Sequence, residues 1–502
     1  MTIAPSSLSI ILPDEAATIQ LGEDLALALK AGDCLALYGD LGAGKSTLAR
    51  AFLRAMADDD MLDVPSPTFT LVQSYELRIP VAHFDLYRLS DASELDELGF
   101  DEALEIGICL VEWPERADDR LPKSVISLHY GFTPDGGRAL TITGPKLKLD
   151  RISRVLAIRA FLDRNAMKAA RRRFLSGDAD YRAYEVVRLD GQPQRILMDS
   201  PPRPDTPVIR FGKTYPELVH LAEDYRPFVA IDQLLASMGV TVPQIYATDP
   251  DGILLTEDLG QDGILDDEGR PIAERYLEAA ATLAFLHGQI VSREITVAPD
   301  HIHRIPDFDT QAMGFETELL LDWYVEWKLG RKPTEDERQT YAQLWSKLFS
   351  QISDRESLVL RDVHSPNLLW QGNRRGIQRV GLIDFQDAMI GPAAYDLASL
   401  VQDARVTVEP DLQRQMLDHY LDLRQSEAGF DHDALLRDFA IMAVQRNCKL
   451  VGLWVRLMKR DGKPDYMKHM PRTLTYLTAA LDHETLHPLR NWLTGLGLLE
   501  RV

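Results

Sequence analysis

Cysteine is scarce in this chain, with three among 502 residues. Three thiols cannot build the disulfide framework of a small secreted domain. Cys34 and Cys109 lie inside apolar runs, which predicts buried thiols, and Cys448 has no neighbour at a metal-ligand spacing. We therefore expect the chain to be held by a hydrophobic core rather than by covalent or metal cross-links.

Long apolar runs are absent as well, since none approaches the roughly 18 residues that span a bilayer. Residues 1–15 lack the basic start and the apolar stretch of a signal peptide. Basic residues are in deficit, 55 against 77 acidic ones, which gives a net charge of −22. Such a surface repels nucleic acid and anionic membranes. We expect a reduced, cytoplasmic protein without direct membrane contact or strong direct nucleic-acid binding, so that another protein would handle any RNA partner.

The length predicts two or three domains. Residues 1–144 alternate strand and helix patterns, as an α/β domain does. In residues 145–150, turn residues and charges replace the periodic pattern, which predicts a domain boundary. A helix, two strands joined by a turn, and then mostly helices follow. We expect one domain over residues 1–147 and another over residues 151–502, without internal repeats.

The first chemical motif is a glycine-rich loop, G-x-x-x-x-G-K-[ST], between an apolar strand and an amphipathic helix. Glycines let backbone N–H groups turn toward a phosphate, and the N-terminus of the helix adds positive potential. Lys45 can reach the terminal phosphates, and the Ser46 hydroxyl can bind Mg²⁺. The motif predicts ATP binding by Gly39, Gly42, Ala43, Gly44, Lys45, Ser46 and Thr47.

A phosphate loop of this kind needs a further carboxylate to organise the metal, at the end of another strand. Glu112 closes the apolar run ICLVEW (108–113) and is the first candidate, and Asp85 in HFDLYRL (83–89) is the second. Each could instead be a solvated residue at a strand end. Trp113 could belong to the core, or could form an aromatic wall beside the nucleotide.

Four segments, in this order, resemble the TsaE family, the small ATPases of bacterial tRNA threonylcarbamoyladenosine (t6A) synthesis. They are GDLGAGKST (39–47), SPTFTLV (66–72), HFDLYRL (83–89) and CLVEWPE (109–115). The resemblance implies an α/β P-loop NTPase domain with Thr68 in a nucleotide-sensing switch and Trp113 near the nucleotide. It implies that Asp85 and Glu112 are catalytic groups that organise metal or water. Partners similar to the TsaB and TsaD proteins are implied too.

The second motif is R-D-x-H-x-x-N at residues 361–367, followed by a strand that ends in I-D-F. Mg²⁺-dependent phosphoryl transfer to a hydroxyl uses this spacing. Asp362 would orient the acceptor hydroxyl and take its proton, while Asn367 and Asp384 would hold Mg²⁺ against the phosphates of ATP. Taken alone, Asp362 could be a turn residue and Asp384 a strand cap. Taken together, they predict a kinase site.

Residues from about 165 to 480 resemble the aminoglycoside-phosphotransferase and choline-kinase superfamily. Segments at 177–184, 196–202, 226–229 and 459–464 resemble more narrowly the AmgK family, sugar kinases that phosphorylate N-acetylmuramate and N-acetylglucosamine at the anomeric hydroxyl in cell-wall recycling. The resemblance implies an α+β protein-kinase-like domain of two lobes, an N-lobe over about 151–260 and a C-lobe over about 261–502. Gly177 would begin the loop over the phosphates, and Glu257 to Leu259 would meet adenine with backbone groups.

One position departs from the usual kinase pattern. Kinases carry a lysine on the third strand of the N-lobe, where it contacts the phosphates, and here that position holds Met198. Arg182 is the candidate replacement cation, with Arg195 behind it, although either could be an ordinary surface arginine. The missing lysine leaves open a pseudokinase that binds nucleotide without transferring phosphate.

The acceptor is the least determined part of the prediction. A sugar site needs hydrogen-bonding side chains and often an aromatic floor. Charged and aromatic residues of two helical segments are candidates, although most of the aromatic ones are expected in the core: Glu316, Trp323, Tyr324, Trp327, Trp454 and Arg456. Arg456 or Lys459 could receive a carboxylate of the acceptor. The leading hypothesis is a bifunctional protein, a t6A-supporting ATPase joined to an amino-sugar kinase. The alternatives are an aminoglycoside or choline kinase, or a pseudokinase scaffold that regulates the ATPase.

Overall fold

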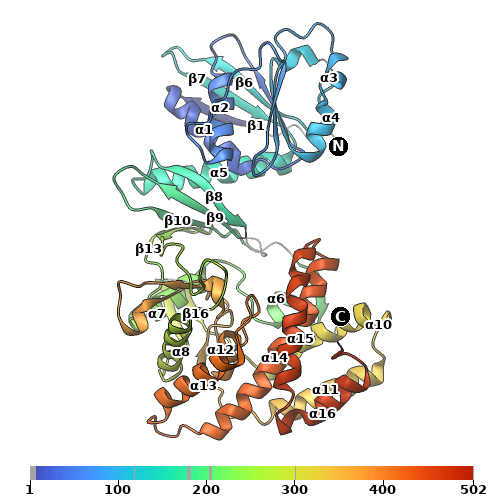
Figure 1. The fold of residues 1–502 in the computed structure, drawn as a ribbon. Coiled ribbons are helices and arrows are strands. Elements are labelled where there is room, and N and C mark those ends of the chain that lie inside the picture. The colour runs from blue at the N-terminus through green and yellow to red at the C-terminus, as the bar shows by residue number, and fades with distance from the viewer. Residues whose placement is uncertain (1–6, 118, 178–181, 203–205, 300, 501–502) are drawn as a thin grey trace. The chain divides into compact units, whose positions relative to one another are not determined.

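The computed structural model describes residues 7–117, 119–177, 182–202, 206–299 and 301–500. The chain divides into two compact units (Figure 1). The first unit holds residues 1–199 with 246–256, and the second holds residues 200–245 with 257–502. Among the described residues, no helix combines the length and the apolar character that crossing a membrane would need.

A seven-stranded sheet with the strand order β1-β7-β6-β2-β5-β4-β3 forms the first part of unit 1. The central strands β6, β2, β5 and β4 run parallel, and the other strands pair antiparallel at the two edges. The strands are β1 (Ser7–Leu12), β2 (Cys34–Tyr38), β3 (Val72–Tyr75), β4 (Val81–Asp85), β5 (Ile108–Glu112), β6 (Ile126–Phe132) and β7 (Arg138–Thr143). The helices are α1 (Glu15–Ala28), α2 (Lys45–Ala57), α3 (Glu94–Glu97) and α4 (Phe100–Ile106).

Helices cover both faces of this sheet, α1 and α2 on one and α3 and α4 on the other (Figure 1). The central strands are therefore continuous apolar runs rather than alternating ones, as expected for parallel strands buried on both faces. The residues 93–105, which have helical spacing, form two short helices instead of one. Gly99 separates them because its φ of 71° lies in the left-handed region, which a helix cannot continue through.

The long helix α5 (Lys146–Arg164) begins in the segment 145–150, where the sequence predicts a domain boundary. Pro145 stands at its N-cap, and a residue such as Leu149 in the charged stretch is buried in the core of the seven-stranded sheet. Further along the same helix, Phe161 and Leu162 are buried in a second core, under the next sheet. A single helix therefore contributes to two neighbouring cores.

The second sheet of unit 1 has five strands in the order β13-β14-β10-β9-β8. These strands are β8 (Arg171–Gly177), β9 (Ala183–Arg188), β10 (Arg195–Asp199), β13 (Ile245–Asp249) and β14 (Ile253–Glu257). The predicted pair of strands around the turn at residues 190–193 is confirmed as β9 and β10, which pair antiparallel. Leu197 of β10 and Val187 of β9 pack on α5 in the second core.

A buried ion-pair network joins the two sheets of unit 1. Asp24 on α1 accepts hydrogen bonds from Arg159 on α5, at 2.8 and 3.0 Å, and from Arg172 on β8 at 2.8 Å. Arg172 is fully buried and also binds Glu185 through two hydrogen bonds of 2.7 and 2.9 Å. Its neighbour Arg173 pairs with Asp58 at the end of α2, at 3.1 Å, and with Asp60 just after it, at 2.8 Å. Every charge in this network has a partner of the opposite sign.

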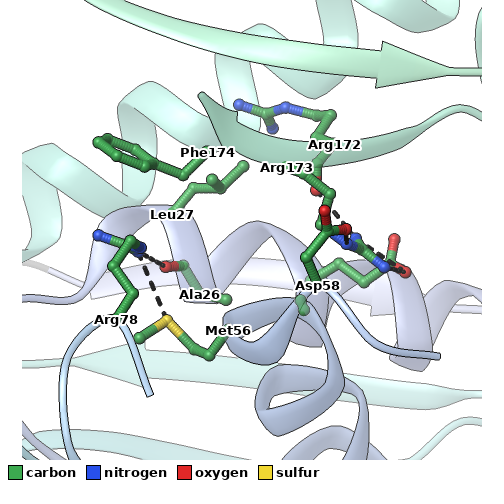
Figure 2. A pocket seen from close by; sticks show the side chains of 10 residues that line it. Ala26, Leu27, Met56, Asp58, Arg78, Arg172, Arg173 and Phe174 are labelled. Atoms are coloured by element: carbon green, nitrogen blue, oxygen red, sulfur yellow. Dashed lines mark hydrogen bonds and ion pairs between the residues drawn. The ribbon is translucent and has the colours of Figure 1, made fainter. Parts of the chain in front are cut away.

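A small cavity of about 190 Å³ lies beside this network, between α1, the end of α2 and β8 (Figure 2). Arg78 lies along its edge, where its guanidinium donates to the carbonyl oxygen of Ala26 at 3.3 Å and stacks on the ring of Phe174 at 4.3 Å. The polar groups around it already have partners within the protein. We regard it as a packing void between two sheets, because ligand pockets are usually larger, about 300–1,000 Å³.

The network predicts a large stability effect. Asp24→Asn should lower the unfolding free energy of unit 1 by about 3–5 kcal/mol, because it leaves buried arginines without their counter-charge. Asp96→Asn is the matched control, since Asp96 pairs with Arg120 at 3.0 Å on the surface and its side chain is 59% exposed. That control should cost at most about 1 kcal/mol. Denaturant unfolding of both variants measures the difference, and equal effects would contradict the prediction.

Unit 2 is mostly helical, with four short antiparallel strand pairs. The helices are α6 (Tyr215–Leu218), α7 (Arg226–Ser237), α8 (Ala273–His287), α9 (Thr310–Leu319), α10 (Glu326–Leu329), α11 (Glu335–Phe349), α12 (Ala394–Val401), α13 (Pro410–Arg424), α14 (His432–Lys459), α15 (Met470–Ala480) and α16 (His487–Gly495). The strand pairs are β11 (Val208–Arg210) with β12 (Lys213–Thr214), β15 (Glu294–Ala298) with β16 (His301–Arg304), β17 (Ser357–Val359) with β20 (Met389–Gly391), and β18 (Leu368–Trp370) with β19 (Val380–Leu382).

Helix α14 is the central helix of unit 2 and packs against α9, α12 and α15. Gly452 permits the close approach of α9, because a Cβ atom there would lie 2.1 Å from the carbonyl oxygen of Leu319. The last turn of α14 continues into a segment that leads to α15, and α12 follows directly on the pair β17–β20. Helix α12 lies against the start of the R-D-x-H-x-x-N segment, since its Asp396 accepts the N–H groups of Leu360 and Arg361.

Candidate functional site

The glycine-rich loop of unit 1 lies between the end of β2 and the start of α2, as predicted. Gly39, Gly42 and Gly44 have φ values of 150°, 78° and 108°, which side-chain-bearing residues rarely adopt. Gly44 is the N-cap of α2 and offers no capping side chain, so the first N–H groups of the helix are left for an anion. The loop has the backbone form of a phosphate cradle.

Lys45 is folded back on this loop. Its ammonium group donates to the carbonyl oxygens of Gly39 at 2.5 Å and Asp40 at 3.0 Å, and it lies 3.9 Å from the centre of the Trp113 ring. Burial lowers its pKa, although the carboxylates of Glu112 and other acids oppose this shift. Trp113 therefore lies beside the loop, with a φ of 57° that marks strained backbone.

The two predicted carboxylates end neighbouring parallel strands. Asp85 of β4 and Glu112 of β5 are register partners, and both are almost fully buried. The Ser46 hydroxyl donates to Glu112 at 2.8 Å, which links the phosphate loop to the end of β5. Asp85 accepts from Ser66 at 3.0 Å and from Thr68 at 3.1 Å, which links the predicted switch segment to the end of β4. The structure thus brings the predicted residues together at one edge of the sheet.

Two residues of this site were missed by the sequence reasoning. His83 is 1% exposed and its Nε2 lies 3.0 Å from Glu112 Oε1. It precedes Asp85 by two residues, so it shares a strand face with Asp85, and this spacing is the signal that could have found it. Arg138 of β7 donates to the carbonyl oxygens of Gly42 and Ala43, both at 3.0 Å. It holds the loop from a strand 95 to 96 residues later in the chain, and no local pattern indicates that contact.

The second site is the loop around Asp362 in unit 2. Asn367 donates to the Asp362 carbonyl at 2.9 Å and to the Asp384 carboxylate at 3.3 Å. Gln386 donates to the other Asp384 oxygen at 2.9 Å. The three predicted residues Asp362, Asn367 and Asp384 therefore meet, although 17 residues separate the last two in the chain.

Strained backbone at this loop is held by a buried carboxylate. Arg361 and Asp384 have φ values of 76° and 62°, which are uncommon for residues other than glycine. The fully buried carboxylate of Asp396 accepts the N–H groups of Leu360 at 2.6 Å and Arg361 at 2.8 Å. These two charge-assisted hydrogen bonds fix the direction in which the chain enters Asp362.

The Arg361 side chain runs into a second buried network. It pairs with Glu316, which also accepts from Lys449 at 2.7 Å and Gln445 at 3.0 Å. Burial raises the pKa of Glu316, but the charges of Lys449 and Arg361 outweigh burial and lower that pKa to about 2. Glu316, a candidate sugar contact from the sequence, is fully buried. It holds the side chain of Arg361, the residue before Asp362.

The remaining predicted nucleotide residues are divided between the two units. In unit 1, Gly177 ends β8, and the four residues after it lie outside the described residues. Arg182 is 8% exposed, and the strand position that usually holds lysine carries the buried Met198. The guanidinium of Arg195 lies 4.3 Å from the centre of the Tyr246 ring.

In unit 2, part of the predicted adenine hinge is bonded within the protein. The Glu257 N–H donates to the Gln244 carbonyl at 2.8 Å, and the Leu259 carbonyl accepts from Gln371 at 2.7 Å. These bonds fix the backbone at both ends of the three-residue segment.

Helix α7 contributes an acid that the sequence reasoning did not single out. Phe228 stacks on Phe385, the residue after Asp384, with ring centres 4.9 Å apart. Asp232, one helical turn further along α7, is 5% exposed, and burial raises its pKa to about 7. One of its carboxylate oxygens has no hydrogen-bond partner among the described residues.

Asp232 predicts a pH-dependent stability. Its folded pKa of about 7 lies above the ordinary value of 3.8, so the folded state binds the proton more tightly. The stabilisation that the protonated Asp232 carboxyl gives the folded state is complete below pH about 4, and it is lost as the pH rises through about 7. Asp232→Asn should therefore gain stability relative to the unaltered chain between pH 4 and pH 8. Unfolding curves at both pH values measure this, and a constant difference would contradict it.

In the part of the chain that the structure describes, no three His, Cys, Asp or Glu side chains form a self-contained metal site. The oxygen ligands of Ser46, Glu112 and Asp85 in one site, and of Asn367 and Asp384 in the other, suit Mg²⁺. Mg²⁺ commonly completes such a set with substrate phosphates and water.

Comparisons with known proteins divide the chain in the same way. Residues 12–139 match the family model described as threonylcarbamoyl adenosine biosynthesis protein TsaE. Residues 171–433 match the phosphotransferase enzyme family. The first match contains the phosphate loop, Asp85 and Glu112, and the second contains Asp362, Asn367 and Asp384.

Individual relatives follow the same division. An N-acetylmuramate/N-acetylglucosamine kinase of Caulobacter vibrioides is 31% identical over 354 residues, which cover 66% of this chain and 94% of the relative. The kinase of the same name from Pseudomonas aeruginosa is 32% identical over a match that covers 61% of this chain and 82% of the relative. A tRNA threonylcarbamoyladenosine biosynthesis protein TsaE of Rickettsia felis is 36% identical over 134 residues, which cover 26% of this chain and 78% of the relative.

Proposed function

Because the chain belongs to the TsaE family over residues 12–139 and to the phosphotransferase enzyme family over residues 171–433, we propose that it is a bifunctional protein. One part is an ATPase that supports t6A modification of tRNA. The other part is an ATP-dependent kinase that phosphorylates N-acetylmuramate and N-acetylglucosamine at the anomeric hydroxyl, for cell-wall recycling. We assign the ATPase to residues 1–147 and the kinase to residues 151–502, and we expect both to work in the cytoplasm.

The observation that carries the kinase assignment is the meeting of Asp362, Asn367 and Asp384. Asp362 is the base that accepts the proton of the acceptor hydroxyl, so that the hydroxyl oxygen attacks phosphorus as the proton leaves. Asn367 and Asp384 hold Mg²⁺, which when bound neutralises charge on the phosphates. Asp396 keeps the loop in the required form through its bonds to Leu360 and Arg361. We retain Gly177, Arg182, Glu257 and Leu259 as proposed nucleotide contacts.

The ATPase assignment rests on the hydrogen bond between Ser46 and Glu112 and on the position of Lys45. Lys45 would exchange its bonds to the loop carbonyls for bonds to phosphate, and Ser46 would bind Mg²⁺. Asp85 and Glu112 would organise the metal or the attacking water. Thr68 would report the nucleotide state through its hydrogen bond to Asp85.

The substrate assignment follows the relatives, two of which are named N-acetylmuramate/N-acetylglucosamine kinases. The test uses the full chain with ATP, Mg²⁺ and four acceptors: N-acetylmuramate, N-acetylglucosamine, kanamycin and choline. We expect phosphate on the anomeric oxygen of the two amino sugars alone, identified by phosphorus NMR. Transfer to kanamycin or choline would favour an antibiotic or choline kinase, and no transfer to any acceptor would favour a pseudokinase scaffold.

The partner assignment follows the TsaE relatives, whose name refers to tRNA threonylcarbamoyladenosine biosynthesis. We propose that proteins similar to TsaB and TsaD bind the ATPase part and handle the tRNA, which fits the net charge of −22. Pull-down of those two proteins by the full chain, with and without ATP, tests this. Tight binding of tRNA by the chain alone would speak against it.

A further inference from the structure

A short segment after α12 is tied to the catalytic loop of unit 2. Asp403 is fully buried and its carboxylate accepts the N–H of Ser365 at 2.7 Å and the hydroxyl of Tyr276 at 3.0 Å. The same carboxylate accepts the N–H of Arg405 at 2.8 Å. The backbone of Arg405 is therefore two hydrogen bonds away from Ser365, three residues after the proposed base Asp362.

The Arg405 guanidinium lies over two aromatic rings, Tyr466 at 5.2 Å and Trp454 at 5.8 Å. These rings stack on each other with centres 5.8 Å apart, and Thr473 accepts the indole N–H of Trp454 at 3.0 Å. Aromatic faces hold a guanidinium in position without using its N–H donors. Within the described ranges of the chain, no carboxylate or carbonyl accepts a hydrogen bond from the Arg405 side chain. A partly exposed guanidinium held in this way keeps its N–H donors for an anion.

The charges around Arg405 strengthen this reading. Arg472 is already bonded to the Ala404 carbonyl at 3.1 Å and the Thr407 hydroxyl at 2.9 Å, so it supports the segment. Burial, with the charges of Arg405 and Arg472, lowers the pKa of His469 to about 4, so His469 is neutral at pH 7. The Asp403 carboxylate already accepts hydrogen bonds from three donors. The local charge facing a ligand is therefore positive.

We propose that Arg405, standing on the rings of Trp454 and Tyr466, receives the carboxylate of the sugar acceptor. This inference rests on the proposed kinase function. N-acetylmuramate differs from N-acetylglucosamine by a lactyl ether that carries a carboxylate, while the reacting anomeric hydroxyl is the same in both. Arg405 therefore determines specificity: it favours the acidic sugar and contributes little to the neutral one.

Arg456 is the rival cation. Its guanidinium lies over Tyr215 at 5.1 Å, and its Nε atom is buried without a hydrogen-bond partner among the described residues. Tyr215 belongs to α6, and the neighbouring charges there are Glu316 and Lys449 of the network below the loop. Arg405 is preferred because Asp403 links its backbone to Ser365 of the catalytic loop, and because its aromatic support is a stacked pair.

The test compares kcat/KM of the full chain for the two sugars. Arg405→Met should lower kcat/KM for N-acetylmuramate about 10- to 100-fold, which is the loss expected for a charge-assisted hydrogen bond. The same substitution should change kcat/KM for N-acetylglucosamine less than about threefold. Arg405→Lys keeps the charge without the fork of donors and should give an intermediate loss for N-acetylmuramate alone. Arg414→Met, on exposed α13, is the matched control.

N-acetylglucosamine serves as an internal check on folding and on the proposed function. Equal losses for both sugars in Arg405→Lys, or no loss in Arg405→Met, would overturn the proposal. A selective loss in Arg456→Met that Arg405→Met lacks would transfer the role to Arg456. If the unaltered chain neither phosphorylates nor binds either sugar, the proposed function itself fails, and the proposal fails with it.

Discussion

Replacing Asp362 by asparagine should slow formation of the sugar phosphate by about 10²–10⁴-fold, the range found for a positioned base. The amide has nearly the same shape as the carboxylate but cannot take the proton of the acceptor hydroxyl. The effect should appear in kcat, with little change in KM for the sugar, because the lost interaction belongs to the transition state.

The structure indicates that this loss would be chemical and not structural. The backbone before Asp362 is held by Asp396, and the backbone carbonyl of Asp362, not its side chain, accepts from Asn367. Asp362→Asn should therefore unfold at the same denaturant concentration as the unaltered chain. Asp418→Asn, an exposed position on α13, is the matched control and should keep full activity.

The measurement must follow the sugar phosphate and not ADP, because the ATPase part would release ADP as well. A rate within about threefold of the unaltered chain would remove Asp362 from the role of base. Because the strand lysine is absent at Met198, such a result would also require another route for the proton and another source of charge near the phosphates.

Much of the two sites could be predicted because their residues are close in sequence or end parallel strands. The phosphate loop is a local pattern of strand, glycines and helix. Asp85 and Glu112 could be paired from sequence because parallel strands present their carboxyl ends at one edge of a sheet. The spacing from Asp362 to Asn367 is likewise local. Each of these predictions needed only the order of the elements.

What could not be predicted depends on contacts between distant residues. The run of three arginines at 171–173 resembles a solvated charge cluster, yet Arg172 is fully buried because Asp24 lies opposite it in space, 148 residues earlier in the chain. The break expected at residues 145–150 is the start of α5, because the sparse apolar positions of that stretch face a core whose other residues lie far away in sequence. The support of Arg405 by Trp454 and Tyr466 is non-local in the same way.

Lys45→Ala should reduce ATP hydrolysis by the first site to background, a loss of at least about 10²–10³-fold if the ammonium stabilises charge on the transferred phosphate. In the structure, this group is bonded to the carbonyls of Gly39 and Asp40. Alanine leaves those carbonyls partly exposed to water, and Arg138 still holds the loop from β7. The loop should therefore keep its form while losing its cation.

The comparison is best made in the Asp362→Asn chain, where the kinase site should consume ATP about 10²–10⁴-fold more slowly. There, Lys45→Ala should remove the remaining hydrolysis, and the exposed Lys123→Ala should leave it unchanged. Undiminished hydrolysis would show that Lys45 is not the catalytic cation. In the chain with Asp362 intact, Lys45→Ala should still form sugar phosphate at the normal rate, because the proposed Mg²⁺ ligands of the second site, Asn367 and Asp384, do not include Lys45. A parallel loss of both activities would instead mean that the two sites are coupled, since loss of a cation at one of them can reach the other only through the protein between them.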